Sequence, residues 1–351
     1  MRILHLNLEK GWRGGERQTL LTLDGLRAGG HEVALAARAG GPLARRAVAA
    51  GIPVFECGGT LGLVRILLTK GQRFDVLHAQ TAQTMSLLAA LRPLLRAALV
   101  FTRRTAFDAA GTEGRHRWKW AKADALVAIS EAAAAAPRAL GLSVVVVPSA
   151  VQAEPTDSRR MHDLRTRFGL DGRRVLVTAA ALSPEKDPLT LIGAVDILRR
   201  THPDVLCLHC GADGAAADAA RARVAELGLA DHYRFAGFLP HVADALALAD
   251  VYVSSSRFEA LGTSVLDACL VGLPIVATDV GGHREILAPD RGLLVPAGDA
   301  AALARRITWV LAHPDAARAM GARAQAMVQR DYAVAAMVAR YERLYRGLRR
   351  A

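Results

Sequence analysis

Aromatic residues and cysteines are scarce in this chain of 351 residues. Only 5% of it is aromatic, whereas 52% is apolar, so we expect cores built mostly of Ala, Leu and Val. A chain of this length forms two cores of ordinary size more readily than one very large core. Of the four cysteines, Cys207 and Cys210 have redox-motif spacing, but residues three apart in a strand face opposite ways. The pattern therefore favours buried free thiols, including Cys57 and Cys269, and a reducing cytoplasm.

Export signals and long apolar runs are also lacking. Arg2 is followed by only a short apolar stretch, 3–8, before Glu9 and Lys10, which is too short for the apolar region of an export signal. No stretch reaches the roughly 18 uncharged apolar residues that a membrane span needs. The sequence therefore predicts a soluble or peripheral protein.

Acidic residues are few in the first half of the chain. Residues 1–150 carry 20 Lys and Arg against 10 Asp and Glu, a net charge of +10, whereas residues 151–351 have a net charge of +2. Such an excess favours an anionic partner such as nucleic acid, phospholipid headgroups or a phosphorylated glycolipid. However, 40 of the 45 cations are Arg, which a GC-rich genome would also produce without any functional reason.

The most informative stretch is 257–286. Glu259 lies in a predicted loop, residues 261–263 lead into a helix that carries Asp267, and the Gly-Leu-Pro sequence at 272–274 ends that helix. The apolar run 275–278 then predicts a buried parallel strand. It leads through a glycine loop into a second helix, so two junctions between loop and helix lie close together in the sequence.

These junctions have the chemistry of a nucleotide-sugar site. A helix N-terminus exposes unpaired N–H groups and the positive end of its dipole, so it holds phosphate, and Gly262 allows a ligand to approach that backbone. Glu259 is suited to accept hydrogen bonds from sugar hydroxyls beside the phosphate. The alternative for Asp267 is a structural one, because Ser264 and Asp267 have the spacing of a capping box.

The stretch resembles the donor-site signature of the retaining family 4 glycosyltransferases. Two acidic residues separated by seven others are followed by a glycine-proline helix stop and a TDVGG loop, and the match continues through 292–296 and Asp299. The second acid is usually Glu in that family, whereas this chain has Asp267. The resemblance implies a GT-B α/β fold, in which two Rossmann-like, doubly wound parallel-sheet domains face a central cleft. The expected parts are an acceptor-side domain (1–152), a nucleotide-sugar-binding domain (153–331) and a terminal helix (332–351) that crosses back.

Strand and helix patterns alternate along the first half, which predicts a parallel sheet whose ligands bind at the carboxyl ends of its strands. The glycine-rich loop 9–16 lacks the dinucleotide fingerprint GxGxxG, and we expect a helix from about Arg17. The resemblance implies that Gly14 and Gly15 lie near the donor phosphates. It also places Gln80 where many family members carry a His that contacts the donor sugar.

In the second half, the resemblance places a phosphate-binding Lys at Lys186. A second family cation, usually Arg, is replaced by Ala181, so Arg103, Arg104 and Arg257 are candidates to supply that charge. The loop that holds Phe238 is expected near the nucleotide base. The full predicted donor-binding set is Gly14, Gly15, Gln80, Phe238, Leu261, Gly262, Thr263, Ser264 and Asp267, and the candidates for acceptor or phosphate contacts are Arg13, Arg103 and Arg104.

The predicted reaction is transfer of a sugar from a nucleotide-sugar with retention of the anomeric configuration. Lys186 and helix N-termini would stabilise the departing diphosphate, and Glu259, the other predicted catalytic residue, would hold sugar hydroxyls. No Asp-x-Asp pattern occurs, so we expect neither a metal nor another cofactor.

A basic, aromatic segment in the first half suggests a membrane-held acceptor. Its predicted membrane contacts are Arg115, Arg117, Trp118, Lys119, Trp120 and Lys122. Such segments suit a membrane interface, but they equally suit a solvated helix with packed tryptophans. With the charge excess, the resemblance implies a glycolipid or oligosaccharide acceptor, as in lipopolysaccharide or cell-surface polysaccharide synthesis, on the cytoplasmic face of an anionic membrane, with no nucleic-acid partner.

Three rival functions are compatible with the sequence. A GT-B epimerase or phosphorylase would share the fold, and a dinucleotide-dependent dehydrogenase is disfavoured by the missing fingerprint. A non-catalytic glycan- or lipid-binding descendant is the main competitor, because Gln80, Ala181 and Asp267 are three departures within one site.

Overall fold

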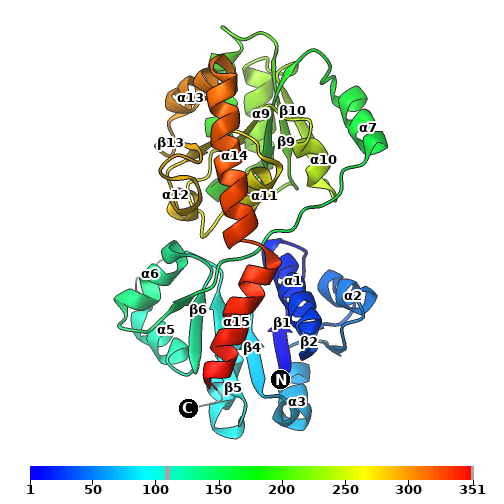
Figure 1. The fold of residues 1–351 in the computed structure, drawn as a ribbon, viewed down its shortest axis with the longest axis vertical. Helices are drawn as coiled ribbons and strands as arrows, with labels where there is room; N and C mark the ends of the chain where they lie inside the picture. Colours follow the sequence, from blue (N-terminus) through cyan, green and yellow to red (C-terminus); the bar gives the residue numbers. More distant parts are fainter. Residues whose placement is uncertain (107–110, 349–351) are drawn as a thin grey trace. The chain divides into compact units, whose positions relative to one another are not determined.

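The computed structural model describes residues 1–106 and 111–348, which form two α/β units (Figure 1). One unit comprises residues 1–150 together with the chain from Tyr332 onward, and the other comprises residues 151–331. The last three residues of the predicted terminal helix, 349–351, lie outside the described residues. Each unit is built on a parallel sheet flanked by helices, so the predicted α/β fold class is confirmed.

The first unit contains a seven-stranded sheet with the order β3-β2-β1-β4-β5-β6-β7, in which every pairing is parallel. The core strands are nearly continuous apolar runs because helices cover both faces of a parallel sheet. The strands are β1 (Arg2–Asn7), β2 (Glu32–Arg38), β3 (Val54–Cys57), β4 (Val76–Ala79), β5 (Ala98–Arg103), β6 (Ala125–Ala128) and β7 (Val145–Val146).

The helices of this unit alternate with its strands. They are α1 (Gly14–Ala28), α2 (Pro42–Ala49), α3 (Thr60–Lys70), α4 (Ala82–Leu91), α5 (Glu113–Trp120), α6 (Glu131–Ala139) and α15 (Val334–Leu348), with short 3-10 turns η1 (Gly71–Arg73) and η2 (Arg92–Leu94). Helix α1 begins at Gly14, earlier than the predicted Arg17, because the Glu16 carboxylate accepts a hydrogen bond from the backbone N–H of Arg13 at 2.9 Å and caps the first turn.

Helix α15 completes the core of the first unit although it is the last helix of the chain. It packs beside α1 (Figure 1), where Gly25 leaves room for Val338. Tyr341 and Tyr345 are fully buried in this core. The Tyr345 hydroxyl lies 2.7 Å from Nδ1 of the buried His78, which therefore has a structural role.

The second unit contains a six-stranded parallel sheet with the order β10-β9-β8-β11-β12-β13. Its strands are β8 (Arg174–Ala179), β9 (Val205–Cys210), β10 (Tyr233–Gly237), β11 (Val251–Ser254), β12 (Ile275–Thr278) and β13 (Leu293–Val295). Its helices are α7 (Ser158–Phe168), α8 (Pro188–Leu198), α9 (Ala217–Glu226), α10 (Val242–Leu246), α11 (Thr263–Val271), α12 (Gly281–Leu287), α13 (Ala300–Ala312) and α14 (Pro314–Asp331), with the turn η3 (Pro184–Lys186).

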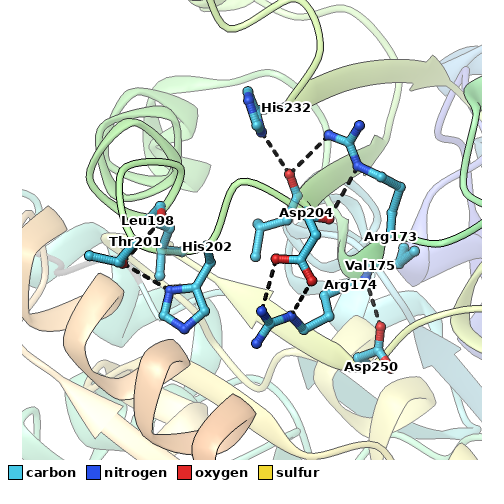
Figure 2. A network of polar contacts seen from close by, with 10 residues as sticks. Arg173, Arg174, Val175, Leu198, Thr201, His202, Asp204, His232 and Asp250 are labelled. Atoms are coloured by element: carbon cyan, nitrogen blue, oxygen red, sulfur yellow. Dashed lines mark hydrogen bonds and ion pairs between the residues drawn. The ribbon is translucent and has the colours of Figure 1, made fainter.

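Charged side chains hold together the amino ends of strands in the second sheet (Figure 2). Arg174, at the start of β8, forms two hydrogen bonds of 2.6 and 2.8 Å with the carboxylate of Asp204, which precedes β9. Asp250, which precedes β11, accepts a hydrogen bond of 2.7 Å from the backbone N–H of Val175. These contacts fix the amino edge, which leaves the loops of the carboxyl edge as the place for ligands.

Two further expectations concern the cysteines and the membrane. All four cysteines are buried free thiols, as predicted, and burial raises the pKa of the Cys210 thiol to about 12. None of the described helices has the length and apolar character needed to cross a membrane.

Candidate functional site

Three neighbouring strands of the second sheet deliver the predicted catalytic side chains to one edge. Strand β11 pairs with β8 on one side and with β12 on the other. The predicted residues Lys186 and Glu259 lie in the connections that follow β8 and β11, and the first turn of α12, which follows β12, adds His283. Because the carboxyl ends of parallel strands meet at one edge, residues more than 70 positions apart become neighbours.

Lys186 and Glu259 form an ion pair at this edge. The Lys186 ammonium donates to Oε1 of Glu259, and the Ser256 hydroxyl donates to the same oxygen at 2.9 Å. The Glu259 side chain is 10% exposed and the Lys186 side chain is 25% exposed. The pair is therefore sheltered but open enough on the lysine side for a ligand to reach it.

The pKa of Glu259 is lowered despite its burial. Burial alone would raise this pKa, but the charge of Lys186, together with the hydrogen bonds from Lys186 and Ser256 and the proximity of His283, outweighs it. Glu259 is consequently a carboxylate near neutral pH. It is suited to accept hydrogen bonds from hydroxyls rather than to donate a proton.

His283 is a member of this site that the sequence analysis did not identify. It is fully buried, and Nδ1–H donates to the backbone carbonyl of Thr278 at 2.9 Å. Its Nε2 lies 3.9 Å from Oε1 of Glu259 and has no hydrogen-bond partner among the residues that the structure describes. Burial lowers the pKa of His283, although Glu259 opposes this effect. The only available signal in the sequence was a histidine that directly follows the two glycines after a buried strand.

Two glycines allow the loops to touch. Gly262 has φ +93°, and a Cβ there would lie 2.9 Å from Cδ2 of His283. A Cβ on Gly282 would lie only 2.2 Å from Cα of Leu261, and the Gly282 N–H donates to the carbonyl of Glu259 at 3.2 Å. Side chains at either position would push apart the loops that carry Glu259 and His283.

A set of hydrogen bonds joins the Lys186 loop to the Glu259 loop. The Ser255 hydroxyl donates to the carbonyls of Lys186 and Asp187 at 3.1 and 2.9 Å. The Arg257 N–H donates to the carbonyl of Glu185, and Arg257 Nε donates to Oδ2 of Asp187, each at 2.8 Å. Asp187 adopts φ +45°, an uncommon value for a residue other than glycine, and these contacts hold it there.

The remaining predicted donor residues of this unit lie along the same edge. Leu261 is buried, and Gly262 precedes helix α11, whose first turn holds Thr263 and Ser264. Ser264 hydrogen-bonds Tyr252, whose pKa burial raises. Asp267 is partly buried one turn further along α11. Phe238 follows β10 and is 58% exposed, so its ring is available to a planar ligand.

The predicted residues of the first unit gather at the carboxyl edge of its own sheet. Gln80 is buried after β4; its amide donates to Nδ1 of His5 at 3.1 Å and accepts from Arg104 at 2.6 Å. Burial lowers the pKa of His5 to about 3, and Arg104 adds to this effect. The Arg104 side chain passes 3.7 Å from the position of a Cβ on Gly15, whereas Gly14 and Arg13 are exposed at the start of α1.

Two predictions in the first unit are wrong. Arg103 is 5% exposed: its guanidinium donates to the carbonyl of Ala133 and lies 5.2 Å from the ring centroid of Trp120, so it is a packing residue rather than a phosphate ligand. Trp120 is 4% exposed and belongs to the core, so it does not face a membrane.

The other predicted membrane contacts lie nearer the surface. Trp118 is 52% exposed, and Arg115, Arg117 and Lys122 are also exposed. Lys119 is partly buried, and burial and Arg115 both lower its pKa.

Among residues 1–106 and 111–348, no group of three or more His, Cys, Asp or Glu side chains is arranged to hold a metal ion. The site chemistry at the second sheet therefore rests on the Lys186–Glu259 pair, the adjacent Arg257 and the N–H groups at the start of α11, which no N-cap side chain binds.

Comparison with known families identifies both halves of the chain. Residues 12–155 match the family described as Glycosyltransferase Family 4, and residues 162–327 match the family described as Glycosyl transferases group 1. The chain carries two glycosyltransferase family domains. The Lys186–Glu259 pair and His283 lie within the group 1 domain, and Gln80 and Arg104 lie within the family 4 domain.

Curated relatives share parts of these domains. A putative glycosyltransferase, EpsD, from Bacillus subtilis is 34% identical over 48% of this chain and 44% of its own length. A 2-deoxystreptamine glucosyltransferase from Streptomyces kanamyceticus is 33% identical over 56% of this chain and 54% of its own length. The chain thus matches only about half of the length of these relatives.

Solved structures match over nearly the whole fold. HepE from Anabaena, crystallised with UDP, superposes with a TM-score of 0.87 at 21% identity, covering 99% of this chain and 100% of its own. A glycosyltransferase from Rickettsia africae superposes with a TM-score of 0.88 at 17% identity, covering 99% and 98%. These glycosyltransferase domains therefore adopt the GT-B fold, as predicted.

Proposed function

We propose that this protein transfers a sugar from a nucleotide-sugar donor to an acceptor with retention of the anomeric configuration. The observation that carries the proposal is the Lys186–Glu259 ion pair, which a neighbouring His and a glycine-lined helix start enclose at the carboxyl edge of the group 1 domain. The proposal is also supported by the solved HepE structures, which contain UDP, UDP with glucose, or UDP-glucose.

In this proposal each group has a distinct task. Lys186 neutralises charge that develops on the departing diphosphate, where electrostatic stabilisation contributes most. The N–H groups at the start of α11 add donors that require no counter-ion. Glu259, ionised by its neighbours, orients the donor sugar through its hydroxyls. Because these groups supply the electrostatic stabilisation, we propose that the reaction requires no metal.

The proposed acceptor is an anionic glycolipid or oligosaccharide bound by the family 4 domain, as in lipopolysaccharide or cell-surface polysaccharide synthesis at the cytoplasmic face of a membrane. The net charge of +10 on residues 1–150 supports this, as does the exposed set around Trp118. A GDP-mannose-dependent mannosyltransferase from Mycolicibacterium smegmatis that is named for a phosphatidylinositol monomannoside is 34% identical over 45% of this chain and 44% of its own length.

The test begins with donor binding. Thermal shift against UDP, GDP, ADP and CDP, followed by the corresponding nucleotide-sugars, should give stabilisation by one base series, because a ligand that binds only the folded state raises its Tm. Release of nucleoside diphosphate should then increase with added acceptor and persist in excess EDTA. Nuclear magnetic resonance of the product should show the anomeric configuration of the donor.

Several outcomes would contradict the proposal. Stabilisation by none of the four diphosphates at millimolar concentration would remove the donor site. Nucleotide release that is independent of acceptor would favour hydrolysis or isomerisation, and binding without any turnover would favour the non-catalytic alternative. The variant Glu259→Gln is the control for the role of the carboxylate in binding and turnover, since it keeps the side-chain shape while removing the charge that pairs with Lys186.

A further inference from the structure

The loops that build the donor site contain few cations. Within 179–188 and 254–263 the cations are Lys186 and Arg257, against the three carboxylates of Glu185, Asp187 and Glu259. The Lys186 ammonium already shares its charge with the buried carboxylate of Glu259. A diphosphate carries at least two negative charges, so this edge requires a second cation with donors to spare.

Arg257 has such donors. Its Nε–H binds Oδ2 of Asp187 at 2.8 Å, and no other side-chain contact of Arg257 is found among residues 1–106 and 111–348. A guanidinium has five N–H donors, so four remain. The side chain is 57% exposed, whereas its partner Asp187 is 5% exposed. Anchored at its inner nitrogen, the guanidinium presents its outer face to solvent.

Asp187, which anchors the Arg257 side chain, belongs to the loop that carries Lys186. Asp187 directly follows Lys186, and its carboxylate accepts hydrogen bonds from the hydroxyl and N–H of Thr190 at 2.7 and 3.4 Å, which fixes it at the start of α8. The Arg257 backbone donates to Glu185 on the other side of Lys186. Arg257 therefore binds the residues on either side of Lys186, so both cations lie at the same carboxyl edge of the second sheet.

We propose that Arg257 is a second ligand for the diphosphate of the nucleotide-sugar, acting beside Lys186. The planar guanidinium suits two parallel hydrogen bonds to phosphate oxygens, which an ammonium cannot form. Of the three arginines left open by the sequence, Arg103 is buried against Trp120 and Arg104 holds Gln80 in the other unit, so Arg257 is the one beside Lys186. The inference rests on the proposed function, because it assumes that this edge binds a nucleotide.

The rival role for Arg257 is a purely structural one, in which its bond to Asp187 only holds the loop. Affinity for a diphosphate compared with that for the bare nucleoside separates the two roles. Loss of a phosphate ligand weakens the diphosphate alone, whereas a loosened loop weakens both.

The experiment measures the Kd of Arg257→Gln by calorimetry, using whichever of UDP, GDP, ADP and CDP binds the wild type, together with its nucleoside. We expect the diphosphate to bind about ten- to a hundredfold more weakly, the loss expected for one charge-assisted contact, with nucleoside binding nearly unchanged. Arg257→Lys, which keeps the charge without the paired donors, should show an intermediate, equally selective loss. It also provides the measurement if Arg257→Gln does not fold.

Arg174→Gln is the matched control. Arg174 forms the same kind of pair with Asp204 at the amino edge of the same sheet (Figure 2), so its loss should leave both affinities unchanged. Equal weakening of diphosphate and nucleoside by the Arg257 variants, or no weakening at all, would overturn the inference while leaving the proposed function intact. Failure of the wild type to bind any of the four diphosphates would instead overturn the proposed function itself.

Discussion

Nε2 of His283 lies 3.9 Å from Oε1 of Glu259, and it is buried without a hydrogen-bond partner in the described part of the chain. Burial lowers the pKa of His283, and in the neutral ring that donates from Nδ1 to Thr278 the lone pair lies on Nε2. Protonation of His283 would place a second positive charge beside Glu259, in competition with Lys186. Because its pKa is lowered, this histidine at the edge of the sheet favours its neutral form near neutral pH.

This arrangement predicts that stability depends on pH through His283. Its pKa is lowered in the folded protein, so below the ordinary value of 6.5 the unfolded chain binds more protons. The unfolding free energy should thus fall as pH drops from about 6.5, by at most roughly 1.4 kcal/mol per pH unit for one group. His283→Asn, which retains a donor toward Thr278, should reduce the slope in urea unfolding between pH 5 and 7. An identical slope in the variant would mean that His283 titrates alike in both states.

The Lys186–Glu259 pair predicts coupled effects on stability and turnover. Lys186→Ala should lower turnover about a hundredfold or more, because it removes charge stabilisation of the leaving group. It should also destabilise the fold, by about 3 to 5 kcal/mol, since it leaves the buried Glu259 carboxylate unpaired.

A double-mutant cycle separates these effects. Adding Glu259→Gln to Lys186→Ala should recover much of the lost stability, because no buried charge then remains, but none of the lost turnover. Urea unfolding measures the stability, and the initial rate of nucleotide release measures the turnover. Recovery of turnover in the double variant would show that Lys186 acts only by holding Glu259.

The contact between Gly282 and Leu261 predicts that a single methyl group will disturb the donor site. A Cβ at Gly282 would lie within 2.2 to 2.6 Å of three backbone atoms of Leu261, so Gly282→Ala must separate the two loops. We expect weaker diphosphate binding and a lower Tm. Gly298→Ala is a control at a glycine with positive φ and no atoms near its Cβ position, so it should lower the Tm without affecting diphosphate binding. Unchanged binding by Gly282→Ala would show that the loops adapt freely.

The different burial of the two tryptophans of helix α5 predicts that their substitutions have different effects on vesicle binding and on stability. Trp118 is exposed, so Trp118→Ala should reduce pelleting with anionic vesicles while leaving the Tm unchanged. Trp120 is buried, so Trp120→Ala should cost about 3 to 5 kcal/mol of stability. Co-sedimentation with anionic and neutral vesicles, in low and high salt, is the measurement. Equal, negligible pelleting with both vesicle types would remove the membrane part of the proposal and leave a soluble acceptor.

Much of the fold could be predicted because parallel sheets leave a strong pattern. Runs such as 275–278 are mostly apolar and β-branched, and each is followed by a loop and a helix start, which identifies the strands and the edge where ligands bind. Glu259 and Lys186 could be assigned to one site only through family resemblance, since nothing local connects residues 73 positions apart.

Other parts of the site depend on packing that no local pattern encodes. In the short helix α5, Trp118 and Trp120 alternate with cations, so the sequence does not reveal which ring faces the core. Arg103 resembles a ligand at the end of a strand, but it is buried against Trp120. His283 enters the site because Gly282 lets the first turn of α12 lie against Leu261, and a lone histidine carries no sequence signal for that.

The return of α15 to the first unit has a consequence for biosynthesis. Four buried residues of α15, Met337, Val338, Tyr341 and Tyr345, complete a core whose other buried members lie within residues 1–150. Residues 151–331, which form the second unit, are translated between these two parts of the core. At roughly 5 to 20 residues per second, the ribosome needs about 10 to 40 s to make residues 151–331. During that interval the nascent first unit lacks the α15 residues that complete its core, so its folding cannot be finished until the second unit has been translated.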